Sequence, residues 1–99
     1  MADQGVSVIA HVQAKKGAEK KVKQQLMSLI APTRSEAGCI TYVLHQAVDD
    51  AGHFMFYENW VSRKDLDGHL KKPYLKTFME RAKDFLEGPV KITLWEMIG

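Results

Sequence analysis

The 99-residue sequence has few of the features that several large function classes depend on. Its single cysteine, Cys39, excludes an internal disulfide and a cysteine-rich zinc site. No apolar run approaches the length of a membrane-spanning helix, and the first four residues lack the basic and apolar regions of a signal peptide. Lys and Arg (14) exceed Asp and Glu (12) by only two, so the chain has no basic footprint for nucleic acid. These absences favour a soluble cytoplasmic protein that binds neither nucleic acid nor membrane.

Common site motifs are absent as well. The sequence contains no phosphate-binding glycine loop, no HExxH zinc motif, no GxSxG nucleophile motif and no Cys/His spacing that indicates a metal site. What it does contain is 45% hydrophobic and 26% charged residues, a composition typical of globular proteins. At this length we expect one compact domain covering residues 1–99.

Apolar residues recur at two different spacings along the chain. A spacing of two, together with β-branched and aromatic residues, predicts strands, and a spacing of three to four predicts helices. The expected strands are residues 6–12, 39–47, 52–61 and 90–98, with a hairpin turn at 48–51. The expected helices start at residue 18, after the cap at 62–65, and at residue 73.

Turn and cap residues set the expected boundaries of these elements. Pro32 lacks a backbone donor and should end or kink the first helix near residue 30, with a short further turn at Thr33–Glu36. Gly38 suits a left-handed helix stop. Ser62–Asp65 resembles a capping box, and Pro73 suits the first turn of the last helix, which Gly88-Pro89 ends.

The order of elements is strand, helix, two strands, helix, strand. Because crossovers between strands of one sheet are right-handed, both helical segments should lie on the same face. We therefore predict an α+β, ferredoxin-like βαββαβ fold, with a four-stranded antiparallel sheet and helices on one face.

The third and fourth expected strands are apolar on both faces. A sheet covered on one side should alternate apolar and polar residues. In the third strand, however, one face carries Phe54, Phe56 and Trp60 and the other carries Met55, Tyr57 and Val61. In the fourth strand, one face carries Ile92, Leu94 and Ile98 and the other carries Trp95 and Met97. A second copy packing sheet against sheet would cover the exposed face, so we predict a homodimer. The alternative is a monomer with a partly apolar surface.

One of the four histidines is placed for chemistry. His11 and His45 lie in expected strands and His53 in the hairpin, whereas His69 lies on the helix that directly follows the strand ending at Trp60. Glu58 shares a strand face with Trp60, so it should be buried and in need of a partner. We predict a Glu58–His69 pair, which acts either as a general base beside an aromatic wall or as a structural link between helix and sheet.

The space between sheet and helices is the expected binding cleft. Its predicted lining is Val8, Ala10, Trp60, Tyr74 and Phe78. Ala10 is small at a position where a larger residue would fill the cleft. A cavity with such walls suits a flat aromatic molecule.

Four segments resemble a known family. Thr33–Cys39, Tyr42–Gln46, Phe56–Trp60 and Asp67–Leu70, in this order, closely resemble the antibiotic biosynthesis monooxygenase family, and the resemblance covers nearly the whole length. It implies a dimeric α+β barrel made of two ferredoxin-like sheets. Members include quinol and anthrone monooxygenases that need no metal, flavin or haem, so the resemblance implies no cofactor.

The resemblance also implies site residues. Glu58, Trp60 and His69 fall on recurrent site positions of the family, and further candidates from the same neighbourhood are Tyr42, His45, Asn59 and Tyr74. The period of two, however, puts Asn59 on the opposite face from Glu58, so either a strand twist brings it into the site or it serves the dimer interface. The expected activity is O₂-dependent oxidation of a small aromatic quinol, which supplies the electrons itself. In this role His69 deprotonates the substrate and Trp60 stacks on its ring.

Other branches of the family give alternative functions. The haem-degrading branch has an asparagine where this chain has Ala10, although His69 could ligate iron. An isomerase of a small phosphorylated carbonyl compound would need a phosphate partner, for which Lys71, Lys72 and Lys76 are candidates. A non-catalytic ligand-binding dimer is the third alternative, since a fold alone does not carry an activity.

Overall fold

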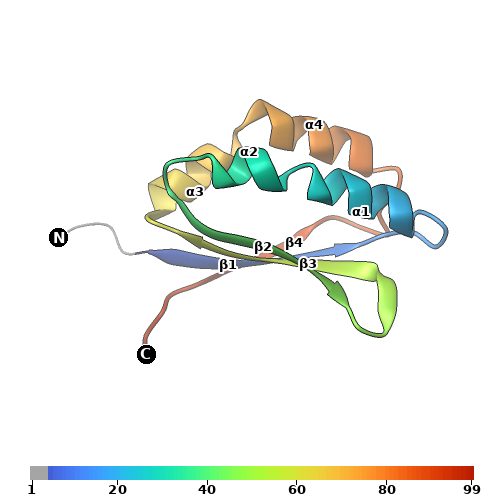
Figure 1. Ribbon diagram of the computed structural model, residues 1–99, viewed down its shortest axis with the longest axis horizontal. Helices are drawn as coiled ribbons and strands as arrows, with labels where there is room; N and C mark the ends of the chain where they lie inside the picture. The colour runs from blue at the N-terminus through green and yellow to red at the C-terminus, as the bar shows by residue number, and fades with distance from the viewer. Residues whose placement is uncertain (1–4) are drawn as a thin grey trace.

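A computed structural model describes residues 5–99 (Figure 1). Its elements follow the chain as β1 (Val6–Gln13), α1 (Glu19–Met27), α2 (Ile30–Arg34), β2 (Cys39–Ala47), β3 (Asp50–Trp60), α3 (Arg63–Leu70), α4 (Pro73–Ala82) and β4 (Lys91–Trp95). The strands form one antiparallel sheet in the order β2-β3-β1-β4. The four helices of residues 5–99 lie on the same face of this sheet, and no helix or strand of these residues covers the other face (Figure 1). The predicted ferredoxin-like fold is confirmed.

The first helical region breaks earlier than Pro32. α1 ends at Met27, and α2 begins at Ile30 and contains Pro32. Pro32 is the third residue of α2, where the backbone N–H would have no partner within the helix, so proline costs little there. The predicted interruption near residue 30 is present, at residues 28–29, but Pro32 lies inside α2 and not at the break. Within residues 5–99 no helix is long and apolar enough to span a membrane.

Gly38 is required for a different reason from the one predicted. Among the described residues only Gly17 has a positive φ, at 93°, so Gly38 is not a left-handed stop. A Cβ atom on Gly38 would instead lie 2.3 Å from Cγ of Asp65. The loop after α2 thus packs directly against the start of α3, and Val61 N–H donates to the Gly38 carbonyl at 2.9 Å.

The caps of α3 and α4 follow the sequence. The Ser62 hydroxyl accepts a hydrogen bond from Asp65 N–H at 3.1 Å, which confirms the predicted cap, while the Asp65 carboxylate accepts from the Ser62 hydroxyl at 2.9 Å. Pro73 occupies the first turn of α4, as predicted.

Two apolar clusters fill the space between helices and sheet. The larger one joins the inner faces of β1, β2 and β3 to α1, α2 and α4, and includes Phe54, Phe56 and Phe78. The smaller one consists of Val8, Trp60 and Leu66 beneath α3. Burial of these apolar surfaces is the main force that holds the helices on the sheet.

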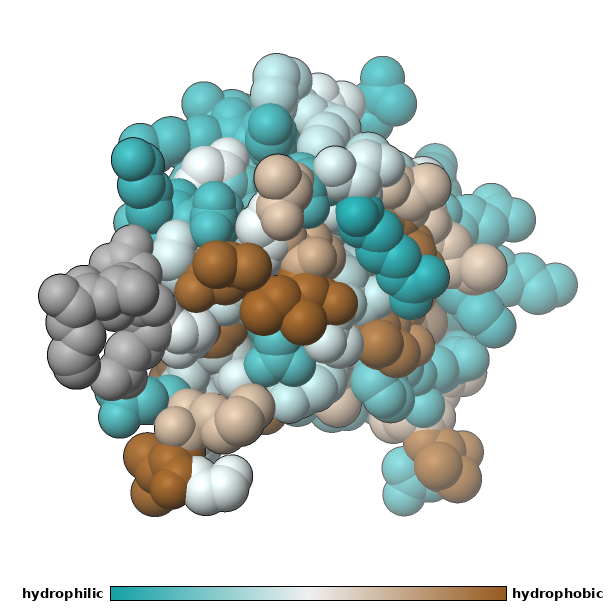
Figure 2. Space-filling view, turned by 60° about the vertical axis from the view of Figure 1, so that its left-hand side comes forward, coloured by the Kyte–Doolittle hydropathy of each residue, from teal (hydrophilic) through white to brown (hydrophobic). Residues whose placement is uncertain are grey.

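The uncovered face, which we call the open face, carries the alternate residues of each strand. Strand pairing places Val43, Tyr57, Ile9 and Thr93 in one row across it. Trp95, which pairs with Ser7, is 56% exposed. β4 ends at Trp95, short of the predicted residue 98, and Met97 and Ile98 follow it as exposed residues. Figure 2 shows exposed apolar side chains, in brown, within a largely polar surface.

Candidate active site

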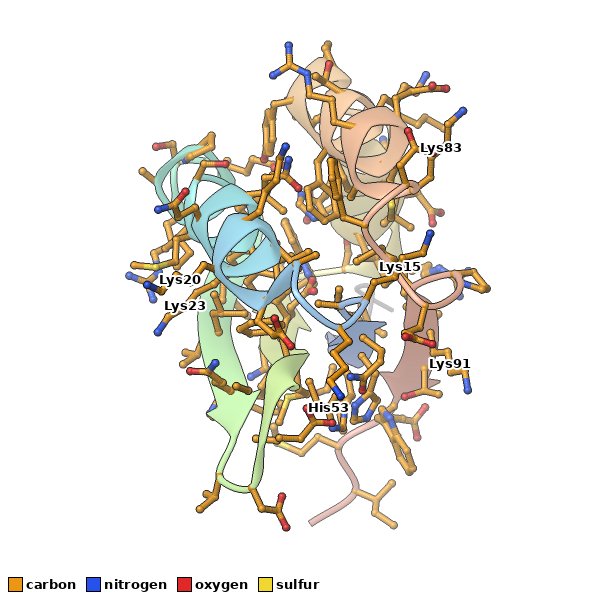
Figure 3. The ribbon with its side chains drawn as sticks, turned by 90° about the vertical axis from the view of Figure 1, so that its right-hand side faces the viewer. Lys15, Lys20, Lys23, His53, Lys83 and Lys91 are labelled. Carbon is orange, nitrogen blue, oxygen red and sulfur yellow. The ribbon has the colours of Figure 1, made fainter. Side chains whose placement is uncertain are left out.

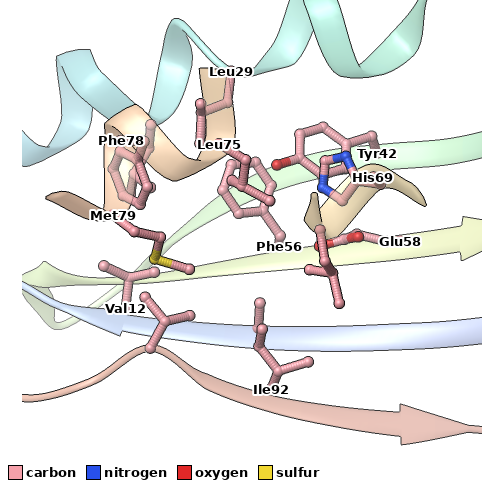
Figure 4. A pocket seen from close by; sticks show the side chains of 14 residues that line it. Val12, Leu29, Tyr42, Phe56, Glu58, His69, Leu75, Phe78, Met79 and Ile92 are labelled. Carbon is pink, nitrogen blue, oxygen red and sulfur yellow. The ribbon is translucent and has the colours of Figure 1, made fainter. Parts of the chain in front are cut away.

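A small cavity of about 30 Å³ lies between the sheet and the helices α3 and α4. This volume holds about one or two water molecules. One end of the cavity is polar, with Tyr42, Glu58 and His69, and the other is apolar, with Val12, Phe78 and Met79 (Figure 4). Ala10 and Phe56 also line it. The sequence-predicted residues Ala10, Tyr42, Glu58, His69 and Phe78 therefore share one cavity.

His69 is the centre of the polar end. It lies in the last turn of α3 and is 2% exposed. Its Nδ1 lies 2.8 Å from Oε2 of Glu36, which follows α2 in the chain. The hydroxyl of Tyr74 donates to the same Glu36 oxygen, and Thr33 Oγ1 lies 3.2 Å from that hydroxyl. A carboxylate that accepts from Nδ1–H leaves Nε2 as the nitrogen with a free lone pair.

Aromatic rings fix the imidazole from two sides. The Trp60 ring lies 4.6 Å from the His69 ring, centroid to centroid, and the Tyr42 ring meets it edge-on at 5.8 Å. Tyr42 in turn stacks on Phe56 at 4.4 Å. Packing and hydrogen bonding therefore restrict His69 to one orientation, which is what a proton-transfer group requires.

Glu58 is the second carboxyl group of the site, and it is 5% exposed. Its Oε1 accepts a hydrogen bond from the Trp60 indole N–H at 2.9 Å. Burial raises the pKa of Glu58 above the usual carboxyl range, although the Trp60 hydrogen bond and the nearby His69 act in the opposite direction. Glu58 is thus a carboxyl group that releases its proton at a higher pH than an exposed one.

The two tyrosines keep their protons to high pH. Burial, and then the negative charge of Glu58, raise the pKa of Tyr42. Burial, and then the hydrogen bond to Glu36, raise the pKa of Tyr74 to about 12. Both hydroxyl groups are therefore hydrogen-bond donors at neutral pH.

Glu58 and His69 share the cavity and are close enough for His69 to lower the pKa of Glu58, but the predicted pair is not joined by a hydrogen bond, because the hydrogen-bond partner of His69 is Glu36. Glu58 is instead bound by Trp60, two residues along the same face of β3. Glu36 and His69 are 33 residues apart and meet because the loop after α2 packs on α3 at Gly38. No periodicity links them, but Glu36 lies inside the Thr33–Cys39 segment that carries the family resemblance, which was the available signal.

Trp60 and Tyr74 do not line the cavity. Trp60 is 1% exposed and packs with Val8 and Leu66 beneath α3, so the imidazole of His69 separates it from the cavity. The prediction that Val8 and Trp60 line the cleft is therefore wrong, and stacking of Trp60 on a substrate ring stays a prediction. Tyr74 reaches the site through its hydrogen bond to Glu36, and its ring lies 6.4 Å from the His69 ring, centroid to centroid.

His45 and Asn59 lie on the other side of the sheet. His45 shares a row with Met55 and His11 on the open face, where it is exposed. Asn59 accepts a hydrogen bond from the Ser7 hydroxyl on the same face. The structure does not place His45 in the predicted cleft, and no strand twist brings Asn59 into it; Asn59 lies on the face where strand alternation predicts it, opposite Glu58.

Comparison with known proteins assigns the family. Residues 5–81 match the family described as antibiotic biosynthesis monooxygenase, and the chain belongs to that family. Rv0793 of Mycobacterium tuberculosis is 32% identical over 89 residues, covering 90% of this chain and 87% of that protein. The uncharacterised protein sll1783 of Synechocystis sp. is 30% identical over 96 residues, and this chain spans 65% of its length.

Solved structures agree with this assignment. PA3566 from Pseudomonas aeruginosa has a TM-score of 0.93 and 28% identity, with 100% of this chain and 99% of that chain covered. The structure of Rv0793 has a TM-score of 0.91 and 29% identity, with 97% of both chains covered. The ferredoxin-like arrangement of one sheet and its helices is therefore shared with these proteins.

Proposed function

We propose that this family member is a cofactor-independent monooxygenase that oxidises small aromatic quinols or anthrones with O₂. The observation that carries the proposal is His69, a buried imidazole whose Nδ1 is held by Glu36 beside an aromatic-lined cavity. Such an arrangement serves to remove a phenolic proton. The family match and the name of Rv0793, which provisionally describes it as a monooxygenase, support the same reaction class.

The proposed reaction begins with proton transfer. Nε2 of His69 accepts the phenolic proton, and the carboxylates of Glu36 and Glu58 stabilise the imidazolium that forms. The substrate anion then supplies four electrons to O₂. One oxygen atom of O₂ forms a bond to a ring carbon, and the other is released as water. The product is therefore a quinone that carries the added oxygen.

The cavity must widen to admit a substrate. At about 30 Å³ it is smaller than an aromatic ring, but Leu70, Met79 and Ile92 line it and are 37–39% exposed, so it is close to the surface between α4 and β4. Met79 is unbranched and adapts easily to a ligand. Phe56 and Phe78 would then flank the ring, and the Tyr42 hydroxyl would be a candidate donor to the developing oxyanion.

The proposed enzyme works as a homodimer. The open face presents Ile9, Val43, Tyr57 and Trp95, which no helix or strand in the described part of the chain covers. A second copy packed on this face would bury on the order of 800 Å² per partner. This contact leaves the cavity of each copy under its own helices.

Oxygen uptake tests the proposal. With a menadiol-type hydroquinone as substrate, the protein should consume O₂ faster than the autoxidation measured with His69→Gln. Uptake at the autoxidation rate for every quinol and anthrone tested would contradict it and favour a ligand-binding role. The phosphate-binding alternative has less support, because no Lys or Arg is among the residues that line this cavity in the described part of the chain.

A further inference from the structure

A groove of about 140 Å³ lies on the helical side of the sheet, between α1 and α4. Gln25 of α1 and Leu29 just after it form one wall, and Tyr74, Phe78 and Arg81 of α4 form the other. The three α4 residues are spaced by four and three positions, so they share one helix face. Figure 3 looks along α1 and α4, which lie side by side above the sheet. Because the proposed dimer packs sheet against sheet, it leaves this groove open.

The groove has the size of one aromatic ring. An engineered protein cavity of about 150 Å³ holds one benzene molecule. The Tyr74 and Phe78 rings and the Leu29 side chain offer apolar surface to such a ring. Leu29 and Phe78 also line the cavity beside His69, so their side chains separate the two spaces. A ring can therefore enter the groove without the widening that the cavity needs.

Arg81 gives the groove a positive charge. None of the ion pairs within residues 5–99 includes Arg81, so in this part of the chain its guanidinium has no carboxylate partner. None of the residues that line the groove in the described part of the chain is acidic. Lys21 of α1 lies over the Phe85 ring, 4.1 Å from its centroid, and adds a second positive charge beside α4, whereas Lys20 and Lys23 point away from α4 (Figure 3). A planar guanidinium binds a carboxylate through two parallel hydrogen bonds, so a carboxylate is the matching group.

Gln25 supplies an unused hydrogen-bonding group. Its Oε1 is buried and, within residues 5–99, has no hydrogen-bond partner. A buried amide oxygen without a partner costs folding free energy, so native proteins seldom keep one without a use for it. Turning the amide toward the groove breaks no hydrogen bond of Oε1 with the described residues. A ligand that carries a hydroxyl group would supply the missing donor.

We infer that the groove between α1 and α4 binds a small hydroxylated aromatic carboxylate. The carboxylate binds Arg81, the ring packs against Leu29 and Phe78, and the hydroxyl group donates to Gln25. This site is distinct from the cavity that holds His69, and the inference does not depend on the proposed oxidation.

NMR titration of the isotope-labelled protein with 4-hydroxybenzoate tests the inference. The backbone amide signals of residues 25–29 and 74–81 should shift in a saturable manner. Arg81→Gln should raise the dissociation constant at least about tenfold, because it removes a charge-assisted hydrogen bond. The matched control is Lys83→Gln, which should leave the dissociation constant unchanged. Lys83 is an exposed cation at the end of the same helix, but its Nζ lies 3.6 Å from the Glu80 carboxylate and it does not line the groove.

A second probe isolates the charge of the ligand. 4-Hydroxybenzamide has the same ring and hydroxyl group but no carboxylate, so it should bind at least about tenfold more weakly. The inference would be overturned by the absence of saturable shifts, by equal dissociation constants for the parent and Arg81→Gln, by equal weakening in Arg81→Gln and Lys83→Gln, or by equal affinity for the two probes. Circular dichroism of both variants checks that folding is retained; since Arg81 and Lys83 are exposed, we expect unchanged spectra.

Discussion

The two faces of the sheet treat the same residue type in opposite ways. Under the helices, His69 is bound through one nitrogen to Glu36 and packed between Trp60 and Tyr42. On the open face, the other three histidines are at least partly exposed, and none of their side-chain hydrogen bonds is to a carboxylate. Burial, and not residue type, makes a histidine suited to proton transfer here, because among the four only His69 is buried and packed between two aromatic rings.

Replacing a histidine on each face of the sheet should give very different losses of activity. His69→Gln should lower the rate of quinol-dependent O₂ uptake by about 10²–10⁴-fold, the usual contribution of a general base. His45→Gln, on the open face, should leave that rate unchanged. Initial rates at saturating quinol, corrected for autoxidation, measure both variants. Equal losses in the two variants would remove the distinction between the faces.

The next effect concerns the group that orients His69. Glu36→Ala removes the acceptor of Nδ1–H and should lower kcat by about 10–100-fold with little change in KM, as orienting partners of histidines commonly do. Glu36→Gln keeps an acceptor oxygen and should restore part of kcat. Steady-state kinetics with one quinol check the series. A rise in KM at constant kcat would show that Glu36 acts on binding and not on the imidazole.

The open face should control assembly and not chemistry. Trp95→Asp places a charge on the proposed sheet-to-sheet interface and should raise the dimer dissociation constant at least about tenfold. Met27→Asp is the matched control, because Met27 is 53% exposed on α1, on the helical side of the sheet. Sedimentation velocity at micromolar concentration measures both. A parent protein that sediments as a monomer would contradict the proposed dimer.

Two glycines test how the site is held together. Gly38→Ala should destabilise the fold by about 1–3 kcal/mol, because the new Cβ would overlap the Asp65 side chain that joins the loop of Glu36 to α3. Gly68→Ala, in the middle of α3, meets nothing within 4 Å and should stabilise the fold by about 0.5–1 kcal/mol. Urea denaturation gives both values. Similar changes in the two variants would show that the contact at Gly38 is unimportant.

The smallest effect is a pH dependence of stability. Since the folded protein raises the pKa of Glu58, ionisation of this group costs folding free energy once the pH rises through that value. Glu58→Gln cannot ionise, but it keeps an oxygen for the Trp60 indole. Its melting temperature should exceed that of the parent at pH 8, and the excess should shrink as the pH falls towards 4. An excess that is constant with pH would contradict the raised pKa.

Local sequence signals predicted the fold well. Strand alternation, the cap at Ser62 and Pro73 at the start of α4 all act within a few residues, and the structure has each of them. Alternation also held at Asn59, whose place on the open face follows from the burial of Glu58 on the same strand.

The candidate site was predictable only in part. His69, Glu58, Tyr42 and Ala10 share the cavity because each lies on a regular element whose inner face the sequence reveals. The Glu36–His69 contact depends on a loop packing against a helix, and no sequence period encodes such a contact. A glycine at position 38 can serve either a close approach of another residue or a left-handed backbone turn, because both exclude a larger side chain. The sequence could not distinguish these two reasons, and the backbone φ angle of Gly38 was needed to do so.

We expect an aromatic ligand to bind under the helices, beside His69. NMR spectra of the four histidine rings, recorded while a naphthoquinone is added, test it most directly. We predict that the ring signals of His69 shift in a saturable manner while those of His11, His45 and His53 stay in place. Saturable shifts of the open-face histidines with no change at His69 would show that the ligand binds on the other side of the sheet.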